Sequence, residues 1–335
     1  MNVFIVGAGR WGTALSYICH FNFKKVYLWD KDNFLLESIK KYRKNPYFFE
    51  NFMYPENVEP VFDLEESIND SDIIISAVPT QVVRDVLSSL EKYIKNPKIF
   101  ISASKGLEIK KLERPSEIIK EVLKRKVKKI FVLSGPNFAE EIIKNVPSLS
   151  VLAGDKGEEI KNLQRLLTTS FFRVYISNDL KGVELGGALK NVYAIGAGIL
   201  DGLNLGYNAR AAFLTRSLVE MSRFGKIMGA RSYTFSGLSG LGDLILTSTS
   251  DLSRNRTFGL LIGKGVEIKE ALSRIKTVEG FYTIKPYVEL AEIKKIYVPI
   301  AKELYEVLYN HKDLKDAIKE LMNRPLKYED VPGIV

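Results

Sequence analysis

The chain has 335 residues, which is enough for two domains with hydrophobic cores of their own. Hydrophobic residues make up 46% of the sequence and charged residues 27%, and this balance excludes a largely disordered or fibrous protein. The formal net charge is +9, which raises the question of an anionic partner.

The positive charge is concentrated between residues 105 and 129, where ten Lys or Arg stand against four Asp or Glu. We interpret the densest part, Lys124–Lys129, as a solvated helix end. Contact with nucleic acid or an anionic membrane is the alternative. No aromatic side chains alternate with these lysines, which disfavours stacking on bases, and we expect no nucleic-acid partner.

Cysteine and histidine are scarce in this sequence. The single cysteine, Cys19, cannot form a disulfide within the chain, and no Cys/His spacing suits zinc, so we expect no metal site. The first residues lack the basic region of a secretory signal, and no apolar run approaches the roughly 18 residues of a membrane span. These features predict a cytoplasmic protein without a membrane span.

In the first half of the chain, short apolar runs alternate with amphipathic stretches, a pattern typical of βαβ units and a mostly parallel sheet. The expected strands are Val3–Val6, Val26–Trp29, Ile73–Val78, Lys98–Ser102, Ile130–Leu133, Leu149–Leu152 and Arg173–Ile176. The clearest helices between them are Asp32–Lys44 and Gln81–Lys95.

After about Asn178 the strand signals stop, and the apolar residues recur at helical spacing. The helical stretches include Val183–Leu200, Ala209–Phe224 and Lys285–Leu308, and glycine-rich turns are expected at Gly202–Gly206 and Gly237–Gly242. The sequence therefore predicts an α/β domain over residues 1–177 and an all-α domain over residues 178–335.

The segment Gly7-Ala8-Gly9-Arg10-Trp11-Gly12 follows the first predicted strand and precedes a predicted helix at Thr13–Phe21. This is the context of the dinucleotide-binding fingerprint. Gly7 permits the tight turn, Gly9 lets the backbone approach a pyrophosphate, and Gly12 allows close helix packing. Because the helix N-terminus also presents N–H donors to an anion, the sequence predicts a Rossmann-type domain that binds NAD or NADP.

An acidic residue about 20 positions after the glycines would bind the ribose hydroxyls of NAD and repel a 2′-phosphate. Asp30 lies 18 residues after Gly12 and fits this role. Lys31 follows at once, and its ammonium group could instead accept the 2′-phosphate of NADP. The sequence favours NAD and leaves NADP open.

The proton donor for hydride transfer to a carbonyl is expected among lysines and carboxylates, because His20 and His311 lie in ordinary helical contexts. Lys105 follows a predicted strand at the end where ligands bind in open α/β sheets. Lys190 lies within a run of small and apolar residues. Partial burial would lower its pKa and allow proton exchange near neutral pH, whereas a lysine that reaches the surface is the alternative.

Three later segments carry polar groups after turns. Asp243 follows a glycine turn, and Ser253-Arg254-Asn255-Arg256 brings together two guanidinium groups, which suit phosphate. A helix start with solvated arginines is an equal alternative. Thr277-Val278-Glu279-Gly280 is by itself only a turn that contains an acid.

Eight segments in this order resemble those of the NAD(P)-dependent glycerol-3-phosphate dehydrogenases, in particular the bacterial single-chain type. They are GAGRWGTAL at Gly7–Leu15, SAVPTQ at Ser76–Gln81, SKGLE at Ser104–Glu108, SGPNFAEE at Ser134–Glu141, ELGGALKNVYAIGAGILDGL at Glu184–Leu203, GLSGLGDLILT at Gly237–Thr247, SRNRTFG at Ser253–Gly259 and VEG at Val278–Gly280. The resemblance implies interconversion of dihydroxyacetone phosphate and sn-glycerol 3-phosphate for phospholipid synthesis. It also implies a helical domain like that of 6-phosphogluconate dehydrogenase, and a homodimer.

The resemblance assigns roles by position. Lys190 corresponds to the catalytic proton donor and acceptor, with Lys105 and Asp243 beside it to orient the carbonyl and the lysine. The substrate-binding positions are Lys105, Gly135, Asn137, Lys190, Asn191, Asp243, Ser253, Arg254 and Asn255. The cofactor-binding positions, with those argued above, are Gly7, Gly9, Arg10, Trp11, Gly12, Asp30, Lys31, Lys105, Ala139, Arg254, Val278 and Glu279.

Two positions depart from the family pattern. Asn137 stands where relatives usually have Ser or Thr, so an amide replaces a hydroxyl group. Asp30 and Lys31 stand where relatives usually have a small residue followed by Arg or His, so an NADP preference is not transferred to this chain.

Two other functions remain open from the sequence. The chain could be a dehydrogenase of the same architecture that acts on a different hydroxy acid or sugar phosphate. It could also be a dinucleotide-binding sensor whose Lys124–Lys129 stretch binds nucleic acid or lipid in a salt-sensitive manner. The sensor hypothesis leaves Lys105, Lys190 and Asp243 without a role.

Overall fold

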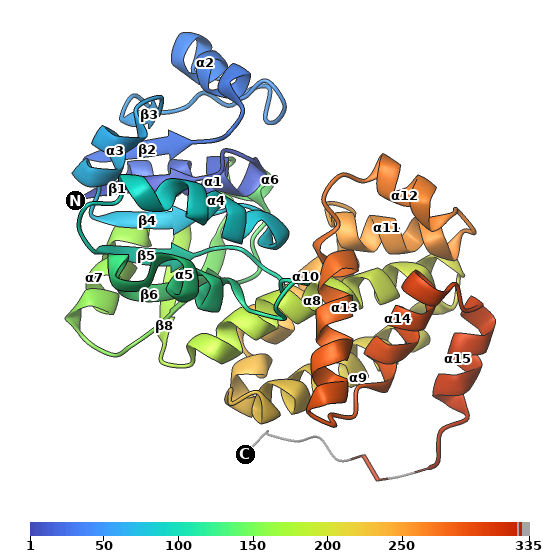
Figure 1. Cartoon of the computed structure of the whole chain (residues 1–335). Helices are drawn as coiled ribbons and strands as arrows, with labels where there is room; N and C mark the ends of the chain where they lie inside the picture. The colour runs from blue at the N-terminus through green and yellow to red at the C-terminus, as the bar shows by residue number, and fades with distance from the viewer. Residues whose placement is uncertain (327, 330–335) are drawn as a thin grey trace. The chain divides into compact units, whose positions relative to one another are not determined.

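The structure, a computed structural model, describes residues 1–326 and 328–329 (Figure 1). The chain forms two compact units. Unit 1 comprises Met1–Ser104 and Pro115–Leu180, and unit 2 comprises Lys105–Arg114 and the chain from Lys181 onward. The sequence-based boundary at residue 177 lies three residues before the observed one, and the prediction placed residues 105–114 in the first domain, whereas they fold with the second.

Unit 1 is built on one eight-stranded sheet with the strand order β3-β2-β1-β4-β5-β6-β7-β8. The strands are β1 Asn2–Val6, β2 Lys25–Trp29, β3 Val58–Pro60, β4 Ile73–Ser76, β5 Lys98–Ser102, β6 Val127–Ser134, β7 Ser148–Ala153 and β8 Phe172–Ser177. All neighbouring strands are parallel except β6 and β7. The seven strands expected from the sequence are present. The short strand β3 was missed because its sequence, Val-Glu-Pro, carries no strand pattern of its own.

Both faces of this sheet are buried, which explains the continuous apolar runs in its strands. Successive residues of β1 alternate between two cores: Val3 and Ile5 belong to one, and Phe4 and Val6 belong to the other. The helical elements of unit 1 are α1 Arg10–His20, α2 Asn33–Tyr42, α3 Leu64–Asp70, η1 Thr80–Val82, α4 Val83–Leu90, η2 Glu91–Tyr93, α5 Pro115–Leu123, η3 Lys124–Lys126, α6 Ala139–Ile142 and α7 Glu158–Leu167. The α1 and α7 helices contribute to the first core, and α4 and α5 contribute to the second.

Unit 2 is helical, with α8 as its central element (Figure 1). Its elements are α8 Leu180–Gly202, α9 Gly206–Ile227, η4 Ser232–Ser236, η5 Leu238–Gly242, α10 Asp243–Thr249, α11 Arg254–Gly263, α12 Ile268–Arg274, α13 Glu279–Ile293, α14 Pro299–Asn310 and α15 Leu314–Met322. Nearly all of α8 is buried. Its small residues permit this, because a Cβ atom on Gly198 would lie 2.0 Å from the carbonyl oxygen of Arg256 on α11.

Two details of unit 2 refine the sequence-based prediction. The periodic stretch Lys285–Leu308 spans two helices, since α13 ends at Ile293 and α14 begins at Pro299, a residue suited to the first helical turn. The predicted turn at Gly237–Gly242 is largely a π-helical turn, η5. A Cβ atom on Gly240 would lie 2.1 Å from the carbonyl oxygen of Phe235, so the expected close backbone approach is present there. Among the described residues, no helix has the length and apolarity needed to cross a membrane.

Candidate active site

The glycine fingerprint forms the turn between β1 and α1, as its sequence context predicts. Gly7 has φ +101°, a backbone conformation that favours glycine, and a Cβ atom on Gly12 would lie only 1.7 Å from the carbonyl oxygen of Gly7. A Cβ atom on Gly9 would meet no atom within 4 Å, so the space beside it is open. Gly9 is the N-cap of α1 and provides no side-chain cap, which suits a helix N-terminus that receives a phosphate.

The side chains beside this turn also suit a dinucleotide. The Nε1 atom of Trp11 is buried, and it has no hydrogen-bond partner among the described residues. The guanidinium group of Arg10 pairs with Glu140 on α6 and lies 4.7 Å from the ring centroid of Phe48. Ala139, the first residue of α6, is buried. A buried indole N–H without a partner is a donor that a ligand oxygen could satisfy.

Asp30 and Lys31 lie just after β2. The Oδ2 atom of Asp30 accepts a hydrogen bond from the backbone N–H of Ala8 at 2.8 Å, and its Oδ1 atom accepts one from the backbone N–H of Asp32 at 3.1 Å. Asp30 therefore also fixes the glycine turn, a role that the sequence-based prediction did not include. A carboxylate has lone pairs for further donors, so ribose hydroxyls remain compatible with this arrangement. Lys31 is exposed.

Gly135 and Asn137 lie in the turn after β6. A Cβ atom on Gly135 would lie 2.9 Å from the carbonyl oxygen of Leu149, and Nδ2 of Asn137 donates to that same oxygen at 2.9 Å. The Oδ1 atom of Asn137 is buried without a partner among the described residues. The amide that replaces the usual hydroxyl group thus fixes the turn to β7 and keeps one acceptor available.

Unit 2 brings together the three residues expected to be catalytic. Lys190 is near the middle of α8, Asp243 begins α10, and Lys105 begins the Lys105–Arg114 segment. The Nζ atom of Lys190 donates to Oδ1 of Asp243 at 2.8 Å, and that of Lys105 donates to Oδ2 at 2.6 Å. Lys190 is 7% exposed and Asp243 is 1% exposed. Two ammonium groups therefore share one buried carboxylate, which leaves the cluster positively charged.

The electrostatics of this cluster suit proton transfer. Burial lowers the pKa of Lys190 from 10.5 to about 8, and the charges of Lys105 and Arg254 add to this effect, while Asp243 opposes it. Burial acts to raise the pKa of Asp243, but the two lysines outweigh burial, so its pKa lies below its ordinary value of 3.8. Near neutral pH the cluster thus contains an ionised carboxylate beside an ammonium group that can release its proton.

Thr247 also belongs to the cluster, and the sequence-based prediction missed it. Its Oγ1 atom accepts a hydrogen bond from Nζ of Lys190 at 2.6 Å and donates to Oδ1 of Asp243 at 3.1 Å. The spacing of four residues could have indicated that Thr247 lies beside Asp243, because residues four apart lie on the same face of a helix.

A chain of amide groups extends the site from Lys105 toward α13. The Nδ2 atom of Asn191 donates to the carbonyl oxygen of Lys105 at 3.3 Å, and Oδ1 of Asn191 accepts from Nδ2 of Asn255 at 2.9 Å. The Oδ1 atom of Asn255 accepts from the backbone N–H of Gly280 at 2.9 Å. These contacts fix the orientation of both asparagine side chains, which are buried.

The remaining predicted residues of unit 2 lie around this chain of amides. Ser253 is the N-cap of α11, and its Oγ atom accepts from the N–H of Arg256. Arg254 is exposed, and its Nη1 atom donates to the carbonyl oxygen of Lys276 at 3.2 Å. Val278 is buried, and Glu279 begins α13. All the candidate residues thus lie within one unit or the other: the glycine turn, Asp30, Lys31, Gly135, Asn137 and Ala139 in unit 1, and the others in unit 2.

The basic stretch Lys124–Lys129 is largely engaged in ion pairs. Lys128 and Lys129 both pair with Glu159, and Lys126 pairs with Glu91. This arrangement favours the solvated helix end over a binding surface for nucleic acid or lipid.

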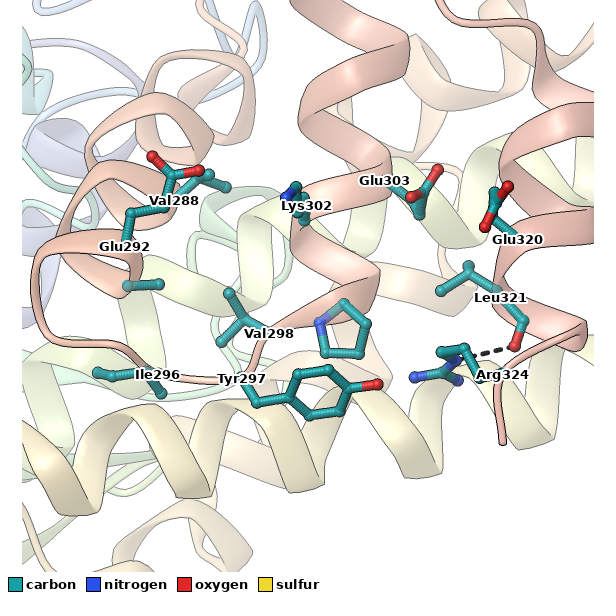
Figure 2. Close-up of a pocket in the computed structure, with 12 residues that line it drawn as sticks. Val288, Glu292, Ile296, Tyr297, Val298, Lys302, Glu303, Glu320, Leu321 and Arg324 are labelled. Atoms are coloured by element: carbon teal, nitrogen blue, oxygen red, sulfur yellow. Dashed lines mark hydrogen bonds between the residues drawn. The ribbon is translucent and has the colours of Figure 1, made fainter. Parts of the chain in front are cut away.

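A cavity of about 350 Å³ lies elsewhere in unit 2, among α13, α14 and α15 (Figure 2). Figure 2 shows the side chains of Glu292, Glu303 and Glu320 around it, with Lys302 and Arg324. None of the predicted site residues lines this cavity. Among the described residues, no group of His, Cys, Asp and Glu could hold a metal ion.

Comparison with known proteins identifies two family models that together match most of the chain. The model described as "NAD-dependent glycerol-3-phosphate dehydrogenase N-terminus" matches residues 2–159. The model described as "NAD-dependent glycerol-3-phosphate dehydrogenase C-terminus" matches residues 179–319.

Full-length relatives agree with these matches. The glycerol-3-phosphate dehydrogenase [NAD(P)+] of Syntrophotalea carbinolica is 42% identical over 331 residues, which cover 98% of this chain and 99% of the relative. The protein of that name from Halothermothrix orenii is 42% identical over 328 residues, or 97% of this chain and 95% of the relative. The crystal structure of a glycerol-3-phosphate dehydrogenase from Coxiella burnetii superposes with a TM-score of 0.91 at 36% identity and covers 96% of this chain and 99% of that one.

Proposed function

The chain belongs to the NAD-dependent glycerol-3-phosphate dehydrogenase family, and on this basis we propose that it interconverts dihydroxyacetone phosphate and sn-glycerol 3-phosphate with Lys190 as proton donor and acceptor. The observation that carries the proposal is the pairing of Lys190 and Lys105 with the buried carboxylate of Asp243 within unit 2. The protein is an NAD(P)-dependent oxidoreductase, and it supplies sn-glycerol 3-phosphate for phospholipid synthesis.

When bound, the nicotinamide supplies a hydride to C2 of the ketone. Lys190 donates a proton to the C2 oxygen, so the carbonyl becomes a secondary alcohol, the reduced cofactor becomes oxidised, and the ammonium group becomes an amine. Lys105 adds positive potential where negative charge develops on that oxygen. Asp243 orients both ammonium groups, because each of its oxygen atoms accepts from one of them.

Arg254 and Asn255 would hold the phosphate group of the substrate. This binding fixes the substrate at a point remote from C2 and places the carbonyl in line for reduction. Dihydroxyacetone, which lacks the phosphate, should therefore show a lower kcat as well as a higher KM. Equal turnover of dihydroxyacetone and its phosphate would contradict this role.

In unit 1, we propose that the α1 N-terminus receives the pyrophosphate, with Gly9 allowing its approach and Trp11 donating to the cofactor. We also propose that Asp30 accepts from the ribose hydroxyls and favours NAD over NADP. The groups that support this preference are the two oxygen atoms of Asp30, which are held in place by the backbone N–H groups of Ala8 and Asp32.

The experiment that tests the function is absorbance at 340 nm with purified protein, dihydroxyacetone phosphate, and either NADH or NADPH. Oxidation of either cofactor would establish the reaction, and a higher kcat/KM with NADH would support the role of Asp30. Tight cofactor binding without oxidation would instead indicate a different substrate, which a panel of hydroxy acids and sugar phosphates, assayed with NAD+ or NADP+ for the alcohols and with NADH or NADPH for the carbonyl compounds, would identify.

Two further predictions belong to this proposal. We propose that the protein acts as a homodimer, which sedimentation at several concentrations would test. We also propose that it acts in the cytoplasm, which fractionation of the source cells would test.

A further inference from the structure

The Lys105–Arg114 segment is unusual because its neighbours in the chain on both sides belong to unit 1, whereas the segment itself folds with unit 2. It begins directly after Ser104 and ends directly before Pro115, the first residue of α5. Its position is therefore set by contacts with the helices of unit 2, and these contacts decide where the ammonium group of Lys105 lies.

The first residues of the segment are held at three points. The Nζ atom of Lys105 bonds to Asp243, and its carbonyl oxygen accepts from Asn191 at 3.3 Å. The side chain of Leu107 is fully buried in the core of unit 2. Of these three contacts, the one between the ammonium group and Asp243 involves the group that is proposed to stabilise charge on the C2 oxygen. The other two hold the segment in place.

The last residue of the segment is held by a buried ion pair. The Nη1 atom of Arg114 donates to Oε2 of Glu184 on α8 at 2.6 Å, and the two side chains are 7% and 0% exposed. Removing one partner of such a pair leaves a buried charge that has lost a close counter-ion, which strongly disfavours the native arrangement. The pair therefore holds the end of the segment firmly against α8.

The two ends of the segment contact the same helix. Glu184 and Asn191 are both on α8, seven residues apart, which is about 10 Å along the helix axis. Between the ends, the backbone N–H of Glu108 donates to the carbonyl oxygen of Glu113 at 2.8 Å and closes the segment into a loop. Leu112 adopts φ +60° in this loop, an unfavourable conformation for leucine that the contacts at both ends must offset.

We propose that Arg114 and Glu184 are positioning residues for the reaction, because their buried pair fixes the Lys105–Arg114 segment so that the ammonium group of Lys105 stays on Asp243. The inference rests on the proposed catalytic roles of Lys105 and Lys190. Arg114 and Glu184 act through Lys105 and take no part in proton transfer themselves.

Loosening this pair has a defined electrostatic consequence. The groups that set the pKa of Lys190 besides burial are Asp243, Lys105 and Arg254. Lys105 lowers that pKa, so its departure from Asp243 would raise it. A merely structural role of the ion pair would not produce this shift.

The test compares Glu184→Gln with the unaltered full-length enzyme under steady-state conditions. We expect kcat for dihydroxyacetone phosphate reduction to fall about tenfold, since a misplacement of about 1 Å caused by a distant substitution can cost up to about a hundredfold. We also expect the alkaline limb of the kcat/KM profile to move to higher pH. Arg114→Lys, which keeps the charge, should retain more activity than Arg114→Gln and serves as the second variant if Glu184→Gln does not fold.

A double variant decides whether the pair acts through Lys105. In a Lys105→Ala background, Glu184→Gln should have no further effect on kcat, because the group that it positions is already absent. The matched control is Glu220→Gln, which makes the same substitution at another buried carboxylate of unit 2, one bonded to the backbone of α14. Glu220→Gln should leave the position of the alkaline limb unchanged.

Three outcomes would overturn the inference or its premise. Multiplicative effects of Glu184→Gln and Lys105→Ala would show that the pair does not act through Lys105. A native alkaline limb in Glu184→Gln, with only a lower unfolding temperature, would show a purely structural role. Native kcat in Lys105→Ala alone would refute the proposed function of Lys105, and with it the basis of this inference.

Discussion

The two compact units present their candidate residues in different ways. In unit 1, the predicted cofactor turn depends mainly on backbone: Gly7 at φ +101°, the open space beside Gly9, and the N-terminus of α1. In unit 2, the proposed catalytic groups are side chains, and Lys190 and Asp243 are almost completely buried. The first arrangement forms from a dozen consecutive residues, whereas the second requires residues far apart in the chain.

This difference has a physical basis. A glycine turn needs only local backbone freedom and a following helix, so it tolerates most distant changes. A pair of lysines on one buried carboxylate is stable only if every partner is present, because a buried charge loses its hydration. We therefore expect substitutions in unit 1 to change cofactor affinity, and substitutions in the cluster to change the rate and the pH dependence.

The largest effect is expected at Lys190. Lys190→Ala should lower kcat at least about 10²-fold, since it removes the proton donor, while the dissociation constant for NADH changes little. Steady-state kinetics and a fluorescence titration of NADH measure the two quantities. Lys181→Ala, which alters an exposed lysine on the same helix, is the control and should keep native kcat. Turnover close to native in Lys190→Ala would remove this residue from the mechanism.

The next effect separates two glycines of the same turn. Gly9→Ala should weaken NADH binding about tenfold, or about 1.4 kcal/mol, while the unfolding temperature stays native, because the added Cβ atom meets only open space. Gly12→Ala should lower the unfolding temperature as well, because its Cβ atom would lie 1.7 Å from the carbonyl oxygen of Gly7. Thermal unfolding and NADH titration of both variants test this pair. Equal unfolding temperatures would show that the close approach at Gly12 is relaxed by a small shift.

The pH dependence should have opposite signs in the two directions of the reaction. The pKa of Lys190 is lowered to about 8, so its protonated form, required for ketone reduction, is lost above that pH. The kcat/KM for reduction should fall about tenfold per pH unit above about 8, and that for alcohol oxidation should fall by a similar factor below it. Initial rates between pH 6 and 10 in both directions, at fixed ionic strength, measure the limbs. If kcat/KM changed with pH in the same sense for reduction and for oxidation, Lys190 would be excluded as the group that titrates.

The last prediction concerns stability rather than activity, at a buried carboxylate outside the proposed catalytic cluster. Glu220 accepts from Tyr193 and from the first backbone N–H groups of α14, and burial raises its pKa from 4.5 to about 7. The folded state therefore holds this proton more tightly than the unfolded state. Its contribution to the free energy of unfolding is fully present below pH 4.5 and is lost as the pH rises to about 7, by about 3 kcal/mol.

Glu220→Gln should flatten this part of the pH dependence, because the amide does not titrate. Denaturant unfolding at pH 5, 6, 7 and 8 measures it. Glu303→Gln alters a carboxylate that lines the cavity of Figure 2 and pairs with Lys312, and it should retain the native slope. If both variants have the native slope, other groups control the stability in this pH range.

Most of the fold of unit 1 could be predicted from the sequence. Strands such as Ile73–Ser76 are β-branched runs, and the helices between them are amphipathic, so local patterns carry the information. The strand β3 lacked such a pattern and pairs with β2 only because the sheet offers an open edge. The antiparallel pairing of β6 and β7 likewise could not be predicted from the local sequence, since strand direction depends on how the chain returns to the sheet.

The candidate catalytic residues divide in the same way. Lys190 could be singled out because a charge within a run of small and apolar residues indicates an unusual environment. Thr247 could not be assigned a contact with it, because they lie 57 residues apart and the hydrogen bond depends on how α10 packs on α8. The ion pair of Arg114 and Glu184 also gave no sequence signal, since both residue types are common at exposed positions.

The sequence alone thus determined the alternation of strands and helices, the glycine turn, and the lysines and acids that the family resemblance indicated. These features depend on local periodicity and on backbone freedom at single residues. Only the tertiary structure decided that Lys105 folds with unit 2, that two ammonium groups share Asp243, and that burial lowers the pKa of Lys190 to about 8. Desolvation and charge pairing depend on distances between residues that are remote in the chain, and packing alone sets those distances.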